Sequence, residues 1–135
     1  MSFESMLTRY VDAFNRGDTE GYGACYAPDV VLRNGAGMEL RGREEIVRYY
    51  ASLRDRVDRV MTIRGICSGD NACAAALASR FTVLVDGVEL GGQILNRGDS
   101  LSIESIALYQ LEGGKFAHIN AATLSRTVTR VEQRA

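Results

Sequence analysis

The side chains of this sequence that could do chemistry begin with Tyr10, a tyrosine in the middle of an apolar helix face. Apolar residues recur at intervals of three and four from Phe3 to Phe14, which predicts an N-terminal helix with one buried face. Tyr10 falls on that face, so its hydroxyl points inward, and a buried hydroxyl needs a hydrogen-bond partner. Ser2 can cap the start of this helix, and Gly17 can close its end in a left-handed conformation.

Two acid–base candidates fall on late predicted strands. Glu104 interrupts an otherwise apolar strand. If it faces a pocket, burial suits it to a general acid or base role, and if it faces out it is a solvated or interface carboxylate. His118 is the single histidine, and strict alternation puts it on the same side of its strand as Phe116 and Asn120. It is a structural or interface residue, or it lines a pocket together with Asn120.

Helices come first among the elements that must position these groups. A short second helix follows Gly17, carries Tyr26 and ends at Pro28. Residues 29–32 form a short strand, and a loop with turn residues follows it. Residues 42–57 form a third helix, and its apolar face again carries a tyrosine, Tyr50.

The second half of the chain has the two-residue period of strands. Strands are predicted over residues 60–67, 73–85, 88–95, 102–111 and 116–129. Asp86-Gly87 is the sharpest hairpin signal between them, since a two-residue turn needs positive φ. Helices followed by antiparallel strands predict an α+β domain with the helices on one face of a curved sheet. The mixed outer face of so long a sheet suits burial against a second copy, so we expect a homodimer.

Composition narrows the class of protein. The 135 residues suit one domain, residues 1–129, with a polar tail at 130–135. A net charge of −1, with both signs spread along the chain, predicts neither a nucleic-acid nor a membrane partner. No secretory leader or membrane span is evident, which predicts a cytoplasmic location. The cysteines and histidine lack metal-ligand spacing, and no phosphate-binding loop is found, so we expect no metal and no cofactor.

The first third of the chain carries a family resemblance. The pattern Arg9-Tyr10-Val11…Asn15…Gly17-Asp18, then Tyr26-Ala27…Asp29, then Gly42…Ile46…Tyr49-Tyr50 resembles the nuclear transport factor 2-like superfamily. Within it, this part of the chain is most similar to the bacterial ketosteroid isomerases and the SnoaL-like polyketide cyclases. The resemblance implies a cone-shaped α+β fold, with a deep apolar pocket between the helices and the concave sheet, and a homodimer. It does not imply a reaction, because one fold hosts many chemistries.

The resemblance implies roles for three tyrosines. Tyr10 matches the isomerase tyrosine that donates to the developing enolate oxygen, and Tyr26 and Tyr50 match two further tyrosines hydrogen-bonded to it. A chain of hydroxyls would polarise the terminal one and aim its proton at a ligand oxygen. The alternative is that all three are packing residues whose hydroxyls bond to backbone or water. The family's aspartate base is replaced by Asn34, and its second acid by the apolar stretch around Ala107.

Two functional hypotheses follow from these observations. The first is a cofactor-independent isomerase, cyclase, hydratase or lyase acting on a small apolar carbonyl or phenolic compound, with Tyr10 as oxyanion donor and Glu104 or His118 handling the proton. The second is a non-catalytic ligand-binding or dimerisation module that has lost the catalytic carboxylates. An epoxide-hydrolase-like use of the fold needs an aspartate–arginine–aspartate set that this sequence does not assemble. The residues expected to contact the ligand are Phe14, Asn34, Phe81, Val83 and Asn120.

Overall fold

The computed structural model describes residues 2–131 of the chain. Its elements follow in the order α1 (Phe3–Arg16), α2 (Thr19–Gly23), β1 (Tyr26–Arg33), β2 (Glu39–Arg41), α3 (Arg43–Leu53), β3 (Val57–Cys67), β4 (Ala72–Val83), β5 (Val88–Leu90), β6 (Gln93–Leu95), β7 (Ser100–Glu112) and β8 (Lys115–Thr129). The strands of the main sheet are ordered β2-β1-β8-β7-β4-β3, and β5 pairs with β6 in a separate hairpin.

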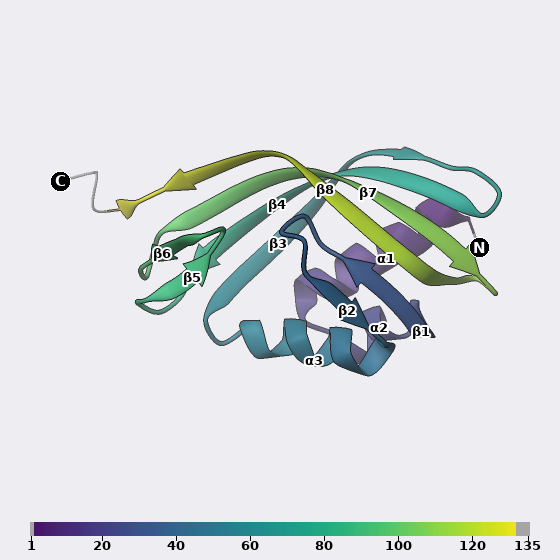
Figure 1. The fold of residues 1–135 in the computed structure, drawn as a ribbon, viewed down its shortest axis with the longest axis horizontal. Helices are drawn as coiled ribbons and strands as arrows, with labels where there is room; N and C mark the ends of the chain where they lie inside the picture. Colours follow the sequence, from purple (N-terminus) through teal and green to yellow (C-terminus); the bar gives the residue numbers. More distant parts are fainter. Residues whose placement is uncertain (1, 132–135) are drawn as a thin grey trace.

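The main sheet is curved, and the helices cover one side of it. Strands β3, β4, β7 and β8 pair antiparallel, whereas β1 runs parallel to β8. Figure 1 shows the sheet as an arch with α1, α2 and α3 gathered beneath it. The predicted α+β architecture, with N-terminal helices packed on a curved sheet, is therefore confirmed. The face of the sheet that looks toward the helices is called the inner face below, and the opposite one the outer face.

Helix α1 has the capping and the orientation that the sequence predicts. The backbone N–H of Ser5 donates to the hydroxyl of Ser2 over 3.1 Å, and Gly17 closes the helix with a φ of 70°. Tyr10 is only 6% exposed and points toward the sheet. Because side chains three and four apart share one helix face, Leu7 and Phe14 are buried with it.

Strand β1 begins earlier than expected. Tyr26 was predicted at the end of the second helix, but α2 stops at Gly23 and Tyr26 is the first residue of β1. Pro28 lies inside this strand, where the pairing with β8 shifts register between Tyr26 and Val31. A proline is tolerated at such an irregularity because it has no N–H to give to the ladder.

The third helix is shorter than expected. The structure ends α3 at Leu53, and Val57, predicted as its last residue, is the first residue of β3. Val57 lies opposite Val83 of β4, and both side chains are buried on the inner face. This pair of β-branched residues therefore belongs to the sheet. Its packing, and not the helical spacing of Val57 from Leu53, decides where α3 ends.

The predicted two-residue hairpin turn at Asp86-Gly87 is wrong. The turn of that kind joins β5 to β6 at Gly91-Gly92, whose φ angles of 62° and 79° suit a primed hairpin turn. Asp86 instead accepts a hydrogen bond of 3.0 Å from the backbone N–H of Arg97, which fixes the loop that leads out of β4.

A second, smaller core lies under the β5–β6 hairpin, and the buried Asp99 stands beside it. Its carboxylate accepts hydrogen bonds from the backbone N–H groups of Asn96, at 2.8 Å, and Val131, at 3.0 Å. Arg130 Nη1 lies 3.9 Å from the same carboxylate. Residues 130 and 131 of the predicted tail are thus tied to the domain, and residues 132–135 lie outside the described residues. Within residues 2–131, none of the helices has the length and apolar content to cross a bilayer.

Candidate functional site

Tyr10 on α1 and Tyr26 on β1 form a hydrogen-bonded pair in the buried layer between helices and sheet. Their hydroxyl oxygens lie 2.7 Å apart, and their ring centroids lie 5.6 Å apart. The side chain of Phe116 stands edge-on to Tyr10, with the ring centroids separated by 5.3 Å. The structure therefore brings together two of the three tyrosines that the sequence analysis singled out.

The pair is protonated and has one proton to spare. Burial raises the pKa of Tyr10 and of Tyr26 well above the usual value for a phenol, so both are neutral at physiological pH. Two hydroxyl protons are present, and only one can lie between the two oxygens. Among the described residues, neither hydroxyl has another hydrogen-bond partner. The second proton therefore has no acceptor among the described residues.

Tyr50 lies near this pair without bonding to it. Its ring centroid is 5.2 Å from that of Phe14, which in turn lies 6.1 Å from the ring of Tyr10. No hydrogen bond joins Tyr50 to the Tyr10–Tyr26 pair within residues 2–131. Tyr109, a buried tyrosine on the inner face of β7, was not predicted, and burial raises its pKa strongly as well. The two-residue alternation of β7, which puts Tyr109 on the same side as the buried Ala107, could have predicted that Tyr109 faces inward.

The cavity beside these rings is much narrower than the deep pocket that the resemblance implies. Its volume is about 20 Å³, close to the space of one water molecule, whereas ligand pockets usually span several hundred Å³. Aromatic rings fill the rest of the space under the sheet, and a ligand larger than water needs some of them to move. The lining residues are Phe14, Tyr22, Tyr50, Leu53, Arg54, Val57 and Arg59.

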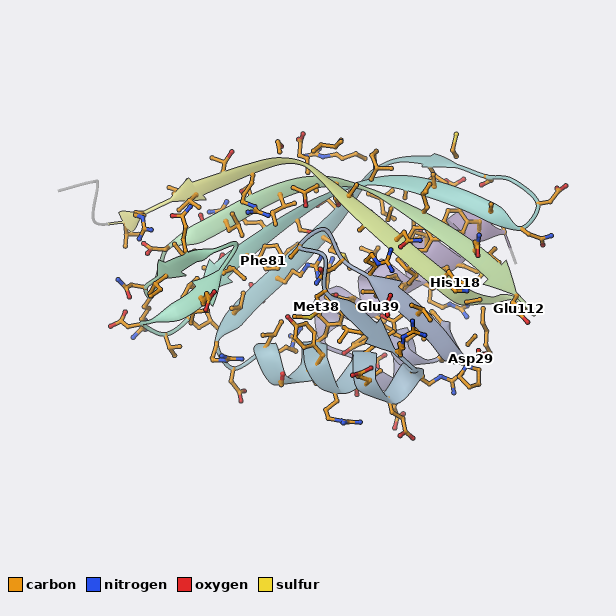
Figure 2. The ribbon with its side chains drawn as sticks, in the orientation of Figure 1. Asp29, Met38, Glu39, Phe81, Glu112 and His118 are labelled. Atoms are coloured by element: carbon orange, nitrogen blue, oxygen red, sulfur yellow. The ribbon has the colours of Figure 1, made fainter. Side chains whose placement is uncertain are left out.

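Glu104 and His118 both lie on the outer face, away from the tyrosine pair. Glu104 is exposed and pairs with Ala78 of β4. His118 and Asn120 are exposed too, although Phe116 on the same strand is fully buried. The expected alternation fails because the pairing of β7 with β8 shifts register just after Phe116. His118 and Asn120, which follow the shift, therefore face the side of the sheet opposite to Phe116. Figure 2 shows His118 well apart from Phe81 of the inner face.

Asn34 acts within its own loop. Its side-chain oxygen accepts hydrogen bonds from the backbone N–H groups of Ala36 and Met38, each over 3.0 Å. Such a bond pattern holds a turn, here the one that joins β1 to β2. The preceding residue, Arg33, is occupied by Glu39 through an ion pair of 2.8 Å. The structure thus gives both residues a structural task at the rim of the sheet.

The apolar residues expected to contact a ligand divide between two places. Phe14 lines the cavity directly. Phe81 is partly buried on the inner face of β4, and Figure 2 shows it beneath the sheet. Val83 is also on the inner face but belongs to the second core under the β5–β6 hairpin. Of the residues expected to contact a ligand, Phe14 and Phe81 lie at or beside the cavity.

Arg59 is the functional candidate that the sequence analysis missed. It lies on the inner face of β3, between the buried residues Val57 and Met61. Its guanidinium carbon is 5.3 Å from the ring centroid of Phe14 and 4.8 Å from that of Phe81. Residues 57, 59 and 61 alternate along one face of a strand, so the sequence pattern could have indicated that Arg59 faces inward. The strand was expected to begin only at residue 60, which left Arg59 outside it.

The polar groups that line the cavity are tyrosine hydroxyls and arginine guanidinium groups. In the part of the chain that the structure describes, no three histidine, cysteine, aspartate or glutamate side chains are grouped as metal ligands would be. The cavity lining contains two phenols, two guanidinium groups and apolar side chains. Such groups can donate hydrogen bonds to oxygen atoms and pack against a flat apolar molecule, once side chains have moved to make room for it.

Solved structures with the same fold belong to proteins with several different names. A polyketide cyclase, so named provisionally, from Pseudomonas putida superposes with a TM-score of 0.77 at 18% identity, covering 90% of each chain. An epoxide hydrolase of the LEH-like type from M. tuberculosis gives a TM-score of 0.72 at 12% identity, covering 88% of this chain and 80% of that one. A Catenulispora acidiphila protein with a ketosteroid isomerase-like fold, in complex with trimethylamine, gives 0.71 at 13% identity, covering 90% and 85%. At these identities the likeness establishes the fold alone.

The sequence itself identifies the family. No curated protein sequence matches the chain. The family model described as the SnoaL-like domain matches residues 7–119, a range that begins within α1, ends near the start of β8 and includes the Tyr10–Tyr26 pair. The chain therefore belongs to the SnoaL-like domain family.

Proposed function

We propose that this domain binds a small apolar compound that bears a carbonyl or phenolic oxygen, with the hydroxyl of Tyr10 or Tyr26 donating to that oxygen. The observation that carries the proposal is the buried pair of hydroxyls 2.7 Å apart, which has two protons and one internal bond. An unused donor in a low-dielectric site favours an oxygen acceptor strongly, because no water competes there.

The surroundings of the pair define the kind of ligand. The rings of Phe14, Tyr22 and Phe116 contact Tyr10, so the body of the ligand meets aromatic surfaces. Offset and edge-to-face ring contacts favour a flat, unsaturated molecule. Tyr50 and Leu53 are only partly buried at the cavity wall, and their movement is the simplest way to admit it.

Catalysis is the second candidate. A proton-transferring isomerase, cyclase, hydratase or lyase needs a base within hydrogen-bonding reach of the substrate. Glu104 and His118 lie on the outer face, and the described residues that line the cavity include no carboxylate and no imidazole. The Tyr10–Tyr26 pair still favours catalysis by stabilising negative charge on a substrate oxygen. In that case water or the substrate itself carries the proton.

The outer face supports the predicted homodimer. Leu108 on β7 is 56% exposed and Leu124 on β8 is 65% exposed, with Val60 of β3 at 46%. Small side chains of β4, among them Ala76 and Ala78, lie between them on the same face. We propose that a second copy covers this mixed face, on which the exposed apolar side chains lie beside Glu104, His118 and Asn120, since exposed apolar side chains that gather on one face commonly mark interfaces.

Binding of bicyclic phenols and enones, measured by ligand-observed NMR, tests the proposal. The wild type is compared with Tyr10→Phe and with Tyr49→Phe, which removes a partly buried phenol outside the pair. We expect Tyr10→Phe to weaken the oxygen-bearing ligands by roughly tenfold, as for one lost hydrogen bond, and to leave a hydrocarbon of the same outline unchanged. Equal loss for the hydrocarbon would show that Tyr10 acts by packing alone. If the wild type converts one of these compounds, a turnover rate about a hundredfold lower in Tyr10→Phe would favour catalysis over binding alone.

A further inference from the structure

Arg59 places a positive charge among aromatic rings on the inner face. Its guanidinium carbon lies 4.8 Å from the ring centroid of Phe81, 5.3 Å from that of Phe14 and 5.8 Å from that of Tyr50. One hydrogen bond is made, from Nη2 to the hydroxyl of the buried Ser79, over 3.2 Å. Three rings around one cation stabilise the charge through their π faces, but they supply no acceptor for its remaining N–H groups.

The Nε–H group of Arg59 is the unpaired donor. Nε is buried, and within residues 2–131 it has no hydrogen-bond acceptor. No carboxylate among the described residues forms an ion pair with this guanidinium. The side chain as a whole is only partly buried, but its buried Nε–H lacks an acceptor, which costs free energy that an acceptor on a ligand would recover.

The neighbouring cavity has the charge that such a partner requires. Arg54 lines it together with Arg59, and no acidic side chain is among its lining residues. Arg54 is held over the end of α1, where Nη1 lies 3.5 Å from the carbonyl oxygen of Phe14. The cavity wall is otherwise aromatic and aliphatic, so positive charge and flat apolar surface meet at one point.

We infer that this cavity, once Tyr50 and Leu53 have moved to widen it, receives a small aromatic carboxylate. One anionic oxygen of this ligand accepts a hydrogen bond from Nε–H of Arg59, while its ring packs among Phe14, Tyr50 and Phe81. Guanidinium groups match carboxylates in shape and charge, and stacking on the same aromatic side chains positions the ring. The inference rests on the proposed function, since it assigns the class of the ligand to the same interior.

A pair of probes that differ in charge tests the inference. Benzoate and benzamide have nearly the same outline, and the second carries no charge. Their affinities are measured by ligand-observed NMR for the wild type, for Arg59→Gln, for Arg59→Lys and for Arg56→Gln, an exposed arginine outside the cavity that gives the same change in net charge. We expect the wild type and Arg56→Gln to prefer benzoate by about tenfold or more, as for one charge-assisted hydrogen bond, and Arg59→Gln to lose that preference.

The wild type alone gives a second readout that needs no folded variant at position 59. The Nε–H resonance of Arg59 is assigned in the wild type itself, through its correlations with the side-chain carbons of Arg59. Benzoate should shift this resonance, and benzamide should not. Benzoate and benzamide bound equally by the wild type would overturn the inference while leaving the proposed function intact. Binding of neither probe, nor of the bicyclic phenols, would overturn both.

Discussion

Removing the two hydroxyls of the Tyr10–Tyr26 pair, singly and together, tests whether they are coupled in the folded protein. The substitutions are Tyr10→Phe, Tyr26→Phe and the double variant. Each single change deletes one hydrogen bond and leaves the other hydroxyl buried without a partner, at about 2 kcal/mol of unfolding free energy. The double change leaves no orphaned group, so it should cost about 2 kcal/mol in all rather than the 4 kcal/mol or so of an additive sum.

The assay is urea unfolding followed by circular dichroism, with the slope of the transition compared across variants. An unchanged slope shows that each substitution alters stability and not the nature of the transition. Tyr49→Phe is the matched control, because Tyr49 is only partly buried and has no hydrogen-bonded phenol partner among the described residues. Its effect should stay within about 0.5 kcal/mol.

The result that would refute the reasoning is additivity. A coupling energy below about 0.5 kcal/mol, the usual scatter for independent sites, would mean that the 2.7 Å contact between the hydroxyls carries no bond of consequence in solution. The spare proton inferred for the pair would then have no basis. A coupling of about 2 kcal/mol would establish the pair as one unit.

Further predictions concern pH and assembly. Backbone N–H groups hold the pKa of Asp99 below its usual range. The stabilisation that Asp99 contributes is therefore present above the unfolded pKa of about 4 and is lost as pH falls below it. Urea titrations between pH 3 and pH 7, roughly the span in which carboxylates titrate, should show a smaller loss of stability in acid for Asp99→Asn than for the wild type. Burial raises the pKa of Tyr10, so stability is lost as pH rises above the unfolded phenol pKa of about 10, and ultraviolet titration should show phenolate from Tyr10 only on unfolding. Leu108→Asp and Leu124→Asp should each give a monomer in sedimentation velocity, whereas Ile94→Asp, an equally exposed site on the β5–β6 hairpin, should leave the dimer intact.

The parts of the fold that local periodicity determines could be predicted from the sequence. Helix α1 was found with its caps and its inward face because one apolar stripe and two capping residues specify it. The family resemblance placed Tyr10 and Tyr26 together even though the second helix was drawn too long. The structure puts Tyr26 on a strand, where its hydroxyl oxygen lies 2.7 Å from that of Tyr10 on α1.

The parts that long-range pairing determines could not be predicted. His118 was expected to share a side with Phe116, but a register shift against β7 separates them, and nothing in the local sequence marks a bulge. Arg59 was missed because the helix preceding it was extended through Val57, so its strand parity was never considered. Glu104 was left open between inside and outside, and only its partner strands decided the matter.

A series of naphthols of constant outline and increasing acidity tests the central claim most directly. At a fixed pH below the pKa values of all the naphthols, the ionised fraction rises with ligand acidity. A hydrogen bond donated by the tyrosine pair favours the ionised form, because the donor acts on the negative charge of its oxygen. We therefore predict that affinity rises steadily with ligand acidity for the wild type and that the slope is much flatter for Tyr10→Phe. The same slope for both proteins, or no dependence on acidity in the wild type, would contradict the assignment of the Tyr10–Tyr26 pair as the oxygen-binding group.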